Sequence, residues 1–317
     1  DKIRSQTKPF LYLFQLVGAK DPVHEGKIMW TLPPLEDIDE QEIIDTALTY
    51  KNGEIKYQLS NPEKDSITEI YALYNQLEGR AHDDLKGLRV LRQESLSAMH
   101  DAYGEVQING RLSDYRSKIL LSAKRCPCCG ITDADEVDHY LPRSIFNVLS
   151  LYSKNLIPLC HQCNNKKRTI RDTDNNRFLH AYFEHIPNDE MFFIATTNIV
   201  DGALAVDFTI QNTEGLSERA YTMMQFQMDK VKLNDRLKKE INIFLMSYSN
   251  SLDTVFNIRE NANDVHDFLV REVRTFSRNF GLNDWRTSLL FSLSNNHEFC
   301  DGGFRAVLPN ANEDDEE

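Results

Sequence analysis

The chain has 317 residues, of which 41% are hydrophobic and 10% aromatic, enough apolar material for one large core or two modest ones. Its 36 lysines and arginines against 49 aspartates and glutamates give a net charge of −13. This excludes a protein that coats nucleic acid through overall charge, because such affinity comes from cations placed against phosphates. No apolar run approaches the roughly 18 residues that span a bilayer, so no membrane segment is expected.

The first region, residues 1–110, is predicted to be mainly helical. An apolar run at 10–17 is expected to be a buried element, and an acidic stretch at 36–45 is expected to be solvated. A clearer helix is expected to begin at Ser66, because Ser66 and Glu69 have the spacing of a capping box and apolar residues follow on one face.

The second region, residues 111–175, carries the chemistry of the chain. A short helix is expected at 112–122, shortly before the first of two CxxC pairs. Between residues 111 and 171 there are 11 lysines and arginines against 5 aspartates and glutamates, a net charge of +6 that leaves −19 for the rest of the chain. A positive patch in an acidic chain attracts a polyanion to one place and repels it elsewhere.

The third region, residues 176–308, is predicted to be helical with one β-hairpin. The expected hairpin joins 191–199 to 204–210 about a turn at Asp201 and Gly202. Helices are expected at 176–186, 264–279 and 285–294, with a long amphipathic one from 216 whose methionines belong to the core. The last segment, 309–317, is too acidic to pack and is predicted to be a disordered tail.

The cysteine pairs have the spacing of a zinc site, because two thiolates three residues apart can bind one tetrahedral ion. The pairs are Cys126 with Cys129 and Cys160 with Cys163. Cys128 is interpreted as a bystander, since it breaks the repeated spacing, and His161 is a possible competitor that a four-cysteine set does not need. Four of six cysteines at metal spacing favour a reducing compartment, the cytoplasm, over a disulfide framework.

The pairs are further apart than a zinc ribbon requires. They are separated by 30 residues, whereas a structural ribbon needs about 15 to 20. The excess holds Asp138, His139 and Asn155, and Asn164 directly follows the last cysteine. A structural zinc alone does not explain this insert.

In order and spacing, these residues and the flanking cysteine pairs resemble the HNH endonuclease family, over residues 124–171. The resemblance implies a hairpin followed by a helix, the ββα-metal fold, with structural zinc at the cysteines. The predicted fold class is therefore α+β and mainly helical, with a small ββα-metal HNH module and its four-cysteine site embedded between helical flanks.

The resemblance also implies roles for the polar residues. His139 would be the general base that takes a proton from the water attacking a phosphodiester, and Asp138 would bind a divalent cation. Asn155 would orient the loop that carries the histidine. Asn164 stands where the family often has histidine, and its amide oxygen would be the second ligand. Losing an imidazole favours Mg²⁺ or Mn²⁺ over zinc or nickel.

A set of cations around the module is expected to hold phosphates of the substrate. The set consists of Arg143, Lys154, Lys166, Lys167 and Arg168. The expected function is a metal-dependent endonuclease that cuts DNA, with RNA as the second choice. By analogy with the family, the acidic helical flanks suit a regulatory ATPase partner in bacterial anti-phage defence. The alternative is a catalytically silent, zinc-structured subunit that binds nucleic acid or acts as a scaffold.

Overall fold

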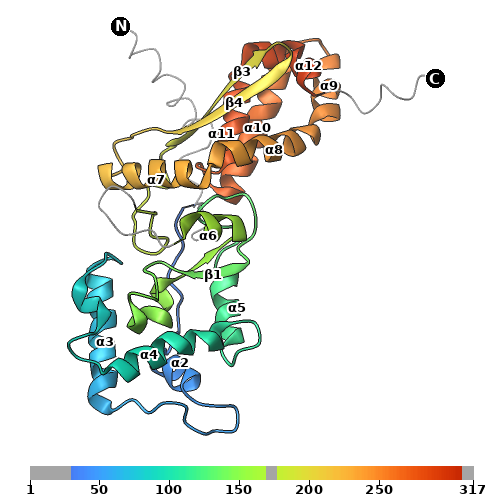
Figure 1. The fold of residues 1–317 in the computed structure, drawn as a ribbon. Coiled ribbons are helices and arrows are strands. Elements are labelled where there is room, and N and C mark those ends of the chain that lie inside the picture. The colour runs from blue at the N-terminus through green and yellow to red at the C-terminus, as the bar shows by residue number, and fades with distance from the viewer. Residues whose placement is uncertain (1–29, 169–176, 309–317) are drawn as a thin grey trace. The chain divides into compact units, whose positions relative to one another are not determined.

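The computed structural model describes residues 30–168 and 177–308. These residues form two compact units, one ending at His185 and the other beginning at Ile186 (Figure 1). The apolar run at 10–17 and the acidic tail at 309–317 lie outside the described residues. Within the described ranges, no helix has the length and apolar character needed to cross a bilayer.

The unit of residues 30–185 combines helices with one small antiparallel sheet. Its elements are α2 (Glu40–Ala47), α3 (Asn61–Gln76), α4 (Gln93–Ala102), α5 (Ser113–Leu121), β1 (Glu136–His139), β2 (Leu156–Leu159) and α6 (His161–Lys167). Strand β1 pairs with β2 so that Asp138 faces Ile157 and His139 faces Leu156. The hairpin followed by α6 is the ββα arrangement expected from the sequence, and α5 is the helix expected at 112–122.

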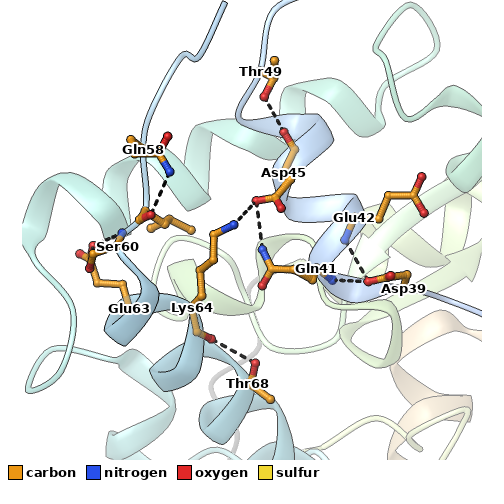
Figure 2. Close-up of polar contacts among 11 residues, drawn as sticks. Asp39, Gln41, Glu42, Asp45, Thr49, Gln58, Ser60, Glu63, Lys64 and Thr68 are labelled. Atoms are coloured by element: carbon orange, nitrogen blue, oxygen red, sulfur yellow. Dashed lines mark hydrogen bonds and ion pairs between the residues drawn. The ribbon is translucent and has the colours of Figure 1, made fainter. Parts of the chain in front are cut away.

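Helix α3 begins earlier than predicted, at Asn61 instead of Ser66. The carboxylate of Glu63 accepts hydrogen bonds from the backbone N–H and hydroxyl of Ser60, at 3.0 and 2.7 Å, which closes a capping box one and a half turns upstream of the expected one. Figure 2 shows Ser60 and Glu63 together at this end of α3. The alternative at Ser66 failed because two equivalent spacings occur in succession, and only the first lies where the chain enters the helix.

Helices α2 and α3 are joined by an ion pair. Asp39 caps α2 by accepting from the N–H groups of Gln41 and Glu42, both at 3.0 Å. Lys64 reaches from α3 to the carboxylate of Asp45 at 2.7 Å (Figure 2). Part of the acidic stretch thus forms a capped helix, and its acidic side chains other than Glu40 are exposed, as expected.

Replacing Glu63 with glutamine is expected to lower the free energy of unfolding at pH 7 by about 1 to 3 kcal/mol, because glutamine cannot accept all the hydrogen bonds that Ser60, Ser95 and Arg92 donate. Two bonds from Arg92, at 3.0 and 2.9 Å, hold the pKa of this carboxyl well below its usual range, although the side chain is buried. A depressed pKa stabilises the fold above the unfolded value, and that stability disappears as the carboxyl protonates in acid. Urea unfolding should therefore show a smaller difference in acid. Glu69→Gln, an exposed change on the same helix, should have little effect.

The unit of residues 186–308 packs a hairpin against helices. Its elements are β3 (Phe193–Val200), β4 (Ala203–Ile210), α7 (Glu218–Val231), α8 (Leu233–Met246), α9 (Ser249–Asn257), α10 (Ala262–Phe280), α11 (Trp285–Ser294), the π-helical turn Phe299–Gly303 and α12 (Phe304–Val307). Strand β3 packs on α11, which packs on α10 (Figure 1). The hairpin turns at Asp201 and Gly202 as predicted, and both have positive φ.

Three expectations for this part of the chain were wrong or incomplete. Residues 177–186 are not helical; they form irregular backbone with a turn at residues 181–183. The long helix expected from 216 is two helices, because Lys232 adopts φ +53° and interrupts the hydrogen-bond ladder. Helix α9 was not predicted at all. The methionines of α7 are buried in the core, as expected.

The fold class is α+β and mainly helical, as predicted. The compact units do not follow the expected boundary between 1–110 and 111–175, however. The segment between β1 and β2 packs on α3 and α4, so the N-terminal helices and the ββα module share one core. The limits 111–175 for a separate nuclease module stay a prediction.

Candidate functional site

The four cysteines of the two CxxC pairs converge on one point. Their sulfur atoms all lie within 4.8 Å of one another, and all four side chains are buried. Sγ of Cys129 and Sγ of Cys160 are 3.8 Å apart, which is about the edge of a tetrahedron with Zn–S bonds of about 2.3 Å. Cys128 is buried but is not part of the group, as the sequence predicted. The donor set and its spacing fit zinc.

Strand β1 and helix α6 face each other through polar side chains. Residues alternate along a strand, so Glu136 and Asp138 share one face, and Asn164 and Lys167, three residues apart, share one face of the helix. Asn164 Nδ2 donates to Glu136 Oε2 at 2.7 Å. Lys167 Nζ donates to Asp138 Oδ2 at 2.6 Å and to the carbonyl oxygen of His139 at 2.7 Å. The cluster is two parallel side-chain pairs across the strand–helix interface.

The pair of Glu136 and Asn164 fixes the direction of the amide group. An ionised carboxylate only accepts hydrogen bonds, so the nitrogen of Asn164 must face Glu136 and its oxygen must point elsewhere. The other carboxylate oxygen of Glu136 contacts Nδ1 of His161 at 2.6 Å. Partial burial opposes the shift, but the bonds from His161 and Asn164 hold the pKa of Glu136 below its usual value. The site therefore contains a second carboxylate in its ionised form.

His139 ends β1 and is buried, with 7% of its surface exposed. Its Nε2 lies 2.9 Å from the carbonyl oxygen of Ser150. A carbonyl only accepts, so Nε2 carries the proton and Nδ1 is the nitrogen with the free electron pair. The ring of Tyr103 packs edge-on against the imidazole at 4.3 Å. Burial lowers the pKa of His139 to about 4, against the opposing effects of Ser150 and Asp138, so the imidazole is neutral at cellular pH.

Asn155 is fully buried and ties together the two ends of the loop that follows His139. Its Oδ1 accepts from the N–H of Leu141 at 2.8 Å, and its Nδ2 donates to the carbonyls of Leu141 and Leu149, both at 3.1 Å. Leu141 lies two residues after His139, and Leu149 directly precedes Ser150, whose carbonyl orients the imidazole. The amide thus holds the loop in the shape that His139 requires.

Tyrosine hydroxyls from the surrounding helices and turns bind backbone carbonyls of the module. Each donates one hydrogen bond of 2.6 to 3.1 Å: Tyr71 to Val148, Tyr103 to Val137, Tyr115 to Leu151 and Tyr182 to Leu156. Because Val148 and Leu151 lie in turns between the strands, their carbonyls have no ladder to join. The tyrosines supply the partners that this irregular buried backbone needs.

The cations expected to hold phosphates differ in their environments. Lys166 and Arg168 are exposed at the end of α6. Lys154 lies 5.9 Å from the ring of Phe183, and Arg143 stacks 5.1 Å from the ring of Tyr103. The ammonium group of Lys167 is buried against Asp138, with 9% of the side chain exposed. A phosphate contact is therefore unsuited to Lys167, and the sequence could not show this because the partner carboxylate of Asp138 lies 29 residues earlier.

Glu40, at the start of α2, supports the same loop from the other side. Its carboxylate accepts from the hydroxyl and, at 3.2 Å, from the N–H of Ser153, two residues before Asn155. Its second oxygen, Oε2, is buried and lacks a hydrogen-bond partner among the described residues. Burial raises the pKa of Glu40 to about 7, although Ser153 and the charge of Lys154 oppose the shift. This carboxyl sits where a neutral group is preferred.

Replacing Glu40 with glutamine is expected to make the protein more resistant to urea at pH 8 and to change little at pH 4. A raised pKa gives stability that is present below the unfolded value near 4.5 and is lost as pH rises towards 7. The shift corresponds to about 3 kcal/mol at pH 8, and glutamine removes that loss. An equal difference at both pH values would contradict the buried ionisation. Glu42→Gln, exposed on the same helix, is the matched control.

Sequence reasoning missed Glu136, Tyr74 and Glu40 as parts of the site. Glu136 could have been found, because it stands two residues before Asp138 on a predicted strand and so shares its face. Tyr74 and Glu40 carried no signal, since their importance comes from long-range packing. His180 was not singled out by the sequence either, and it is buried.

Comparison with known proteins matches residues 126–169 to the family model of the HNH endonuclease. The matched segment contains both cysteine pairs, β1, β2 and α6, so these residues form an HNH endonuclease domain of zinc-knuckle type. An HNH domain implies a nuclease-type function and a nucleic-acid substrate. No curated protein and no solved structure matches the chain.

Proposed function

We propose that the protein is a metal-dependent endonuclease that hydrolyses phosphodiester bonds in DNA, with RNA as the second candidate substrate. The observation that carries the proposal is the state of His139. Its Nε2 is committed to the carbonyl of Ser150, so Nδ1 is a free base, and the imidazole stands beside Asp138. This is the arrangement that a general base requires.

In the proposed reaction, Nδ1 of His139 takes a proton from a water molecule. The water oxygen forms a bond to phosphorus while the bond from phosphorus to the 3′ oxygen breaks, and the leaving oxygen takes a proton from a solvent water molecule. Burial keeps the imidazole neutral, and the hydrogen bond from Nε2 to Ser150 steadies the imidazolium that forms. Such general-base catalysis contributes about 10²- to 10⁴-fold.

Asp138 and Asn164 are the proposed ligands of a divalent cation. A carboxylate and an amide oxygen are hard donors that suit Mg²⁺ or Mn²⁺. Glu136 holds the nitrogen of Asn164, which leaves the amide oxygen for the ion. When bound, the ion would stabilise charge on the pentacoordinate phosphate and on the leaving oxygen. Lys167 balances the charge of Asp138 and holds the carbonyl of His139.

Lys166 and Arg168 are proposed to bind phosphates next to the scissile one, because both are exposed at the end of α6, the helix that carries Asn164. Arg143 and Lys154 are half-buried and lie against aromatic rings, so they are proposed to contribute less to phosphate binding. The net charge of +6 over residues 111–171 in a chain of −13 favours one local contact surface.

The proposal also includes a protein partner and a biological role. The acidic flanks suit a protein partner, and a regulatory ATPase in bacterial anti-phage defence remains the partner proposed by family analogy. Cytoplasmic location is supported by the four-thiolate site, which requires reduced cysteines. Native copurification tests the partner: recovery of a free monomer with full constitutive activity would contradict it.

Plasmid cleavage tests the activity. Wild-type protein with its zinc retained should nick or linearise plasmid DNA in Mg²⁺ or Mn²⁺ and should stop in EDTA. Single-stranded DNA and RNA substrates, assayed in parallel, decide between the substrates. Binding of nucleic acid without cleavage of either one, under every metal, would favour the silent scaffold instead.

A further inference from the structure

Two residues outside the HNH domain contact its middle asparagine through one chain of hydrogen bonds. Tyr74, on α3, donates from its hydroxyl to Oδ1 of Asn155 at 3.1 Å, and the same hydroxyl lies 3.0 Å from Nε2 of His180. All three side chains are fully buried. These hydrogen bonds connect the N-terminal helices to the HNH domain and to the segment that follows the domain.

The direction of each hydrogen bond in this chain follows from chemistry. Nδ1 of His180 lies 3.2 Å from the backbone N–H of Tyr182, which can only donate, so Nδ1 is unprotonated. Nε2 of His180 must then carry the ring proton and donate to the hydroxyl of Tyr74. The hydroxyl in turn has its one proton to give, and Oδ1 of Asn155 receives it. Burial raises the pKa of Tyr74, so the phenol keeps this proton.

Through Asn155, these hydrogen bonds influence the imidazole of His139. With Oδ1 held by Tyr74 together with the N–H of Leu141, the nitrogen of Asn155 faces the carbonyls of Leu141 and Leu149. Those contacts shape the loop whose next residue, Ser150, accepts from Nε2 of His139. Inverting the amide of Asn155 would set its nitrogen against the donor of Tyr74 and break this sequence of bonds.

We infer that Tyr74 and His180 are positioning residues for catalysis: they fix the amide of Asn155 and, through it, the loop that orients His139. The inference rests on the proposed nuclease function. It also gives the flanking sequence a part in the reaction, because neither residue lies within 126–169. Neither is proposed to touch the substrate.

Packing near His180 supports this assignment. The ring lies 4.0 Å from that of Tyr140 and 4.6 Å from that of Phe183. Gly79, just beyond the end of α3, adopts φ +73°, and a Cβ there would come within 2.4 Å of the imidazole. The ring is therefore held in place by close neighbours on several sides, as a fixed donor requires.

Three variants of the full chain separate hydrogen bonding from packing. Tyr74→Phe removes only the hydroxyl, His180→Gln keeps a donor and an acceptor, and His180→Leu keeps a similar volume without either. Tyr74→Phe and His180→Leu should lower kcat for plasmid cleavage about 10- to 100-fold with KM unchanged. His180→Gln should stay within about threefold of wild type, and Tyr50→Phe, at an exposed tyrosine, is the control.

Equal losses in His180→Gln and His180→Leu, or a change confined to KM, would overturn the inference. A second measurement is independent of cleavage. Long-range ¹H–¹⁵N spectra of the full chain, labelled at histidine, should show His180 and His139 as neutral Nε2–H tautomers, with the His139 signals altered in Tyr74→Phe. A protonated Nδ1 on His180 overturns the chain of bonds. If wild type cuts nothing, the nuclease proposal fails while these spectra still judge the positioning.

Discussion

Replacing His139 with alanine is expected to lower the rate of Mg²⁺-dependent cleavage by about 10²- to 10⁴-fold. The variant lacks Nδ1, the atom to which the proposed mechanism assigns the general-base role and whose partner nitrogen is bound to Ser150. Affinity for nucleic acid should change little, because the proposed phosphate contacts lie on other residues. Plasmid cleavage under single-turnover conditions, with filter binding of the same substrate, measures both quantities.

The loss at His139 must be separated from damage to the fold, because the side chain is buried. Zinc content and the thermal unfolding midpoint of the variant should show a zinc-loaded, folded protein. His297→Ala, at an exposed histidine in the other unit, should cleave at the wild-type rate. Full activity in His139→Ala would remove the general base from the mechanism.

Replacing Cys160 with serine is expected to abolish zinc binding and destabilise residues 30–185. The four sulfurs surround one point, and Cys160 directly joins β2 to α6. Structural zinc sites in small peptides contribute about 10 to 16 kcal/mol of apparent binding energy. The free energy lost when the site no longer binds zinc should therefore exceed the free energy of unfolding of a typical domain. Metal analysis and thermal unfolding measure the effect, and cleavage should be lost with the fold.

The chain provides matched controls for this variant. Cys128→Ser changes a buried cysteine one position from a ligand, and Cys300→Ser changes a buried cysteine in the other unit. Both should retain one zinc ion for each chain. Loss of zinc in Cys128→Ser but not in Cys129→Ser would show that the ligand set is misassigned.

Local spacing in the sequence was enough to predict the zinc site and the hairpin at Asp201 and Gly202. Thiolates three residues apart and a turn pair between two apolar strands constrain only a few neighbouring residues, so their signals survive without tertiary information. The same is true of α10, whose buried residues Val265, Leu269 and Val273 repeat at helical spacing.

Two features that local sequence patterns did not predict, the start of α3 and the role of Lys167, depend on tertiary contacts. The start of α3 depended on which of two similar capping boxes could recruit Arg92 and Ser95 to the buried carboxylate of Glu63. The role of Lys167 depended on α6 presenting it to Asp138. None of these contacts can be predicted from local sequence spacing, because the partners are 29 to 32 residues apart.

The tyrosine hydroxyls described above make the nuclease domain poorly portable. A graft of residues 111–175 into another protein would omit the rings that bind the carbonyls of Val137 and Val148, as well as Tyr182. Each buried carbonyl left without a donor costs about 1 to 3 kcal/mol, and the graft would leave such carbonyls in β1, in β2 and in the turn between them. Transfer of a stable nuclease domain to another protein would therefore require residues 30–185 as a whole.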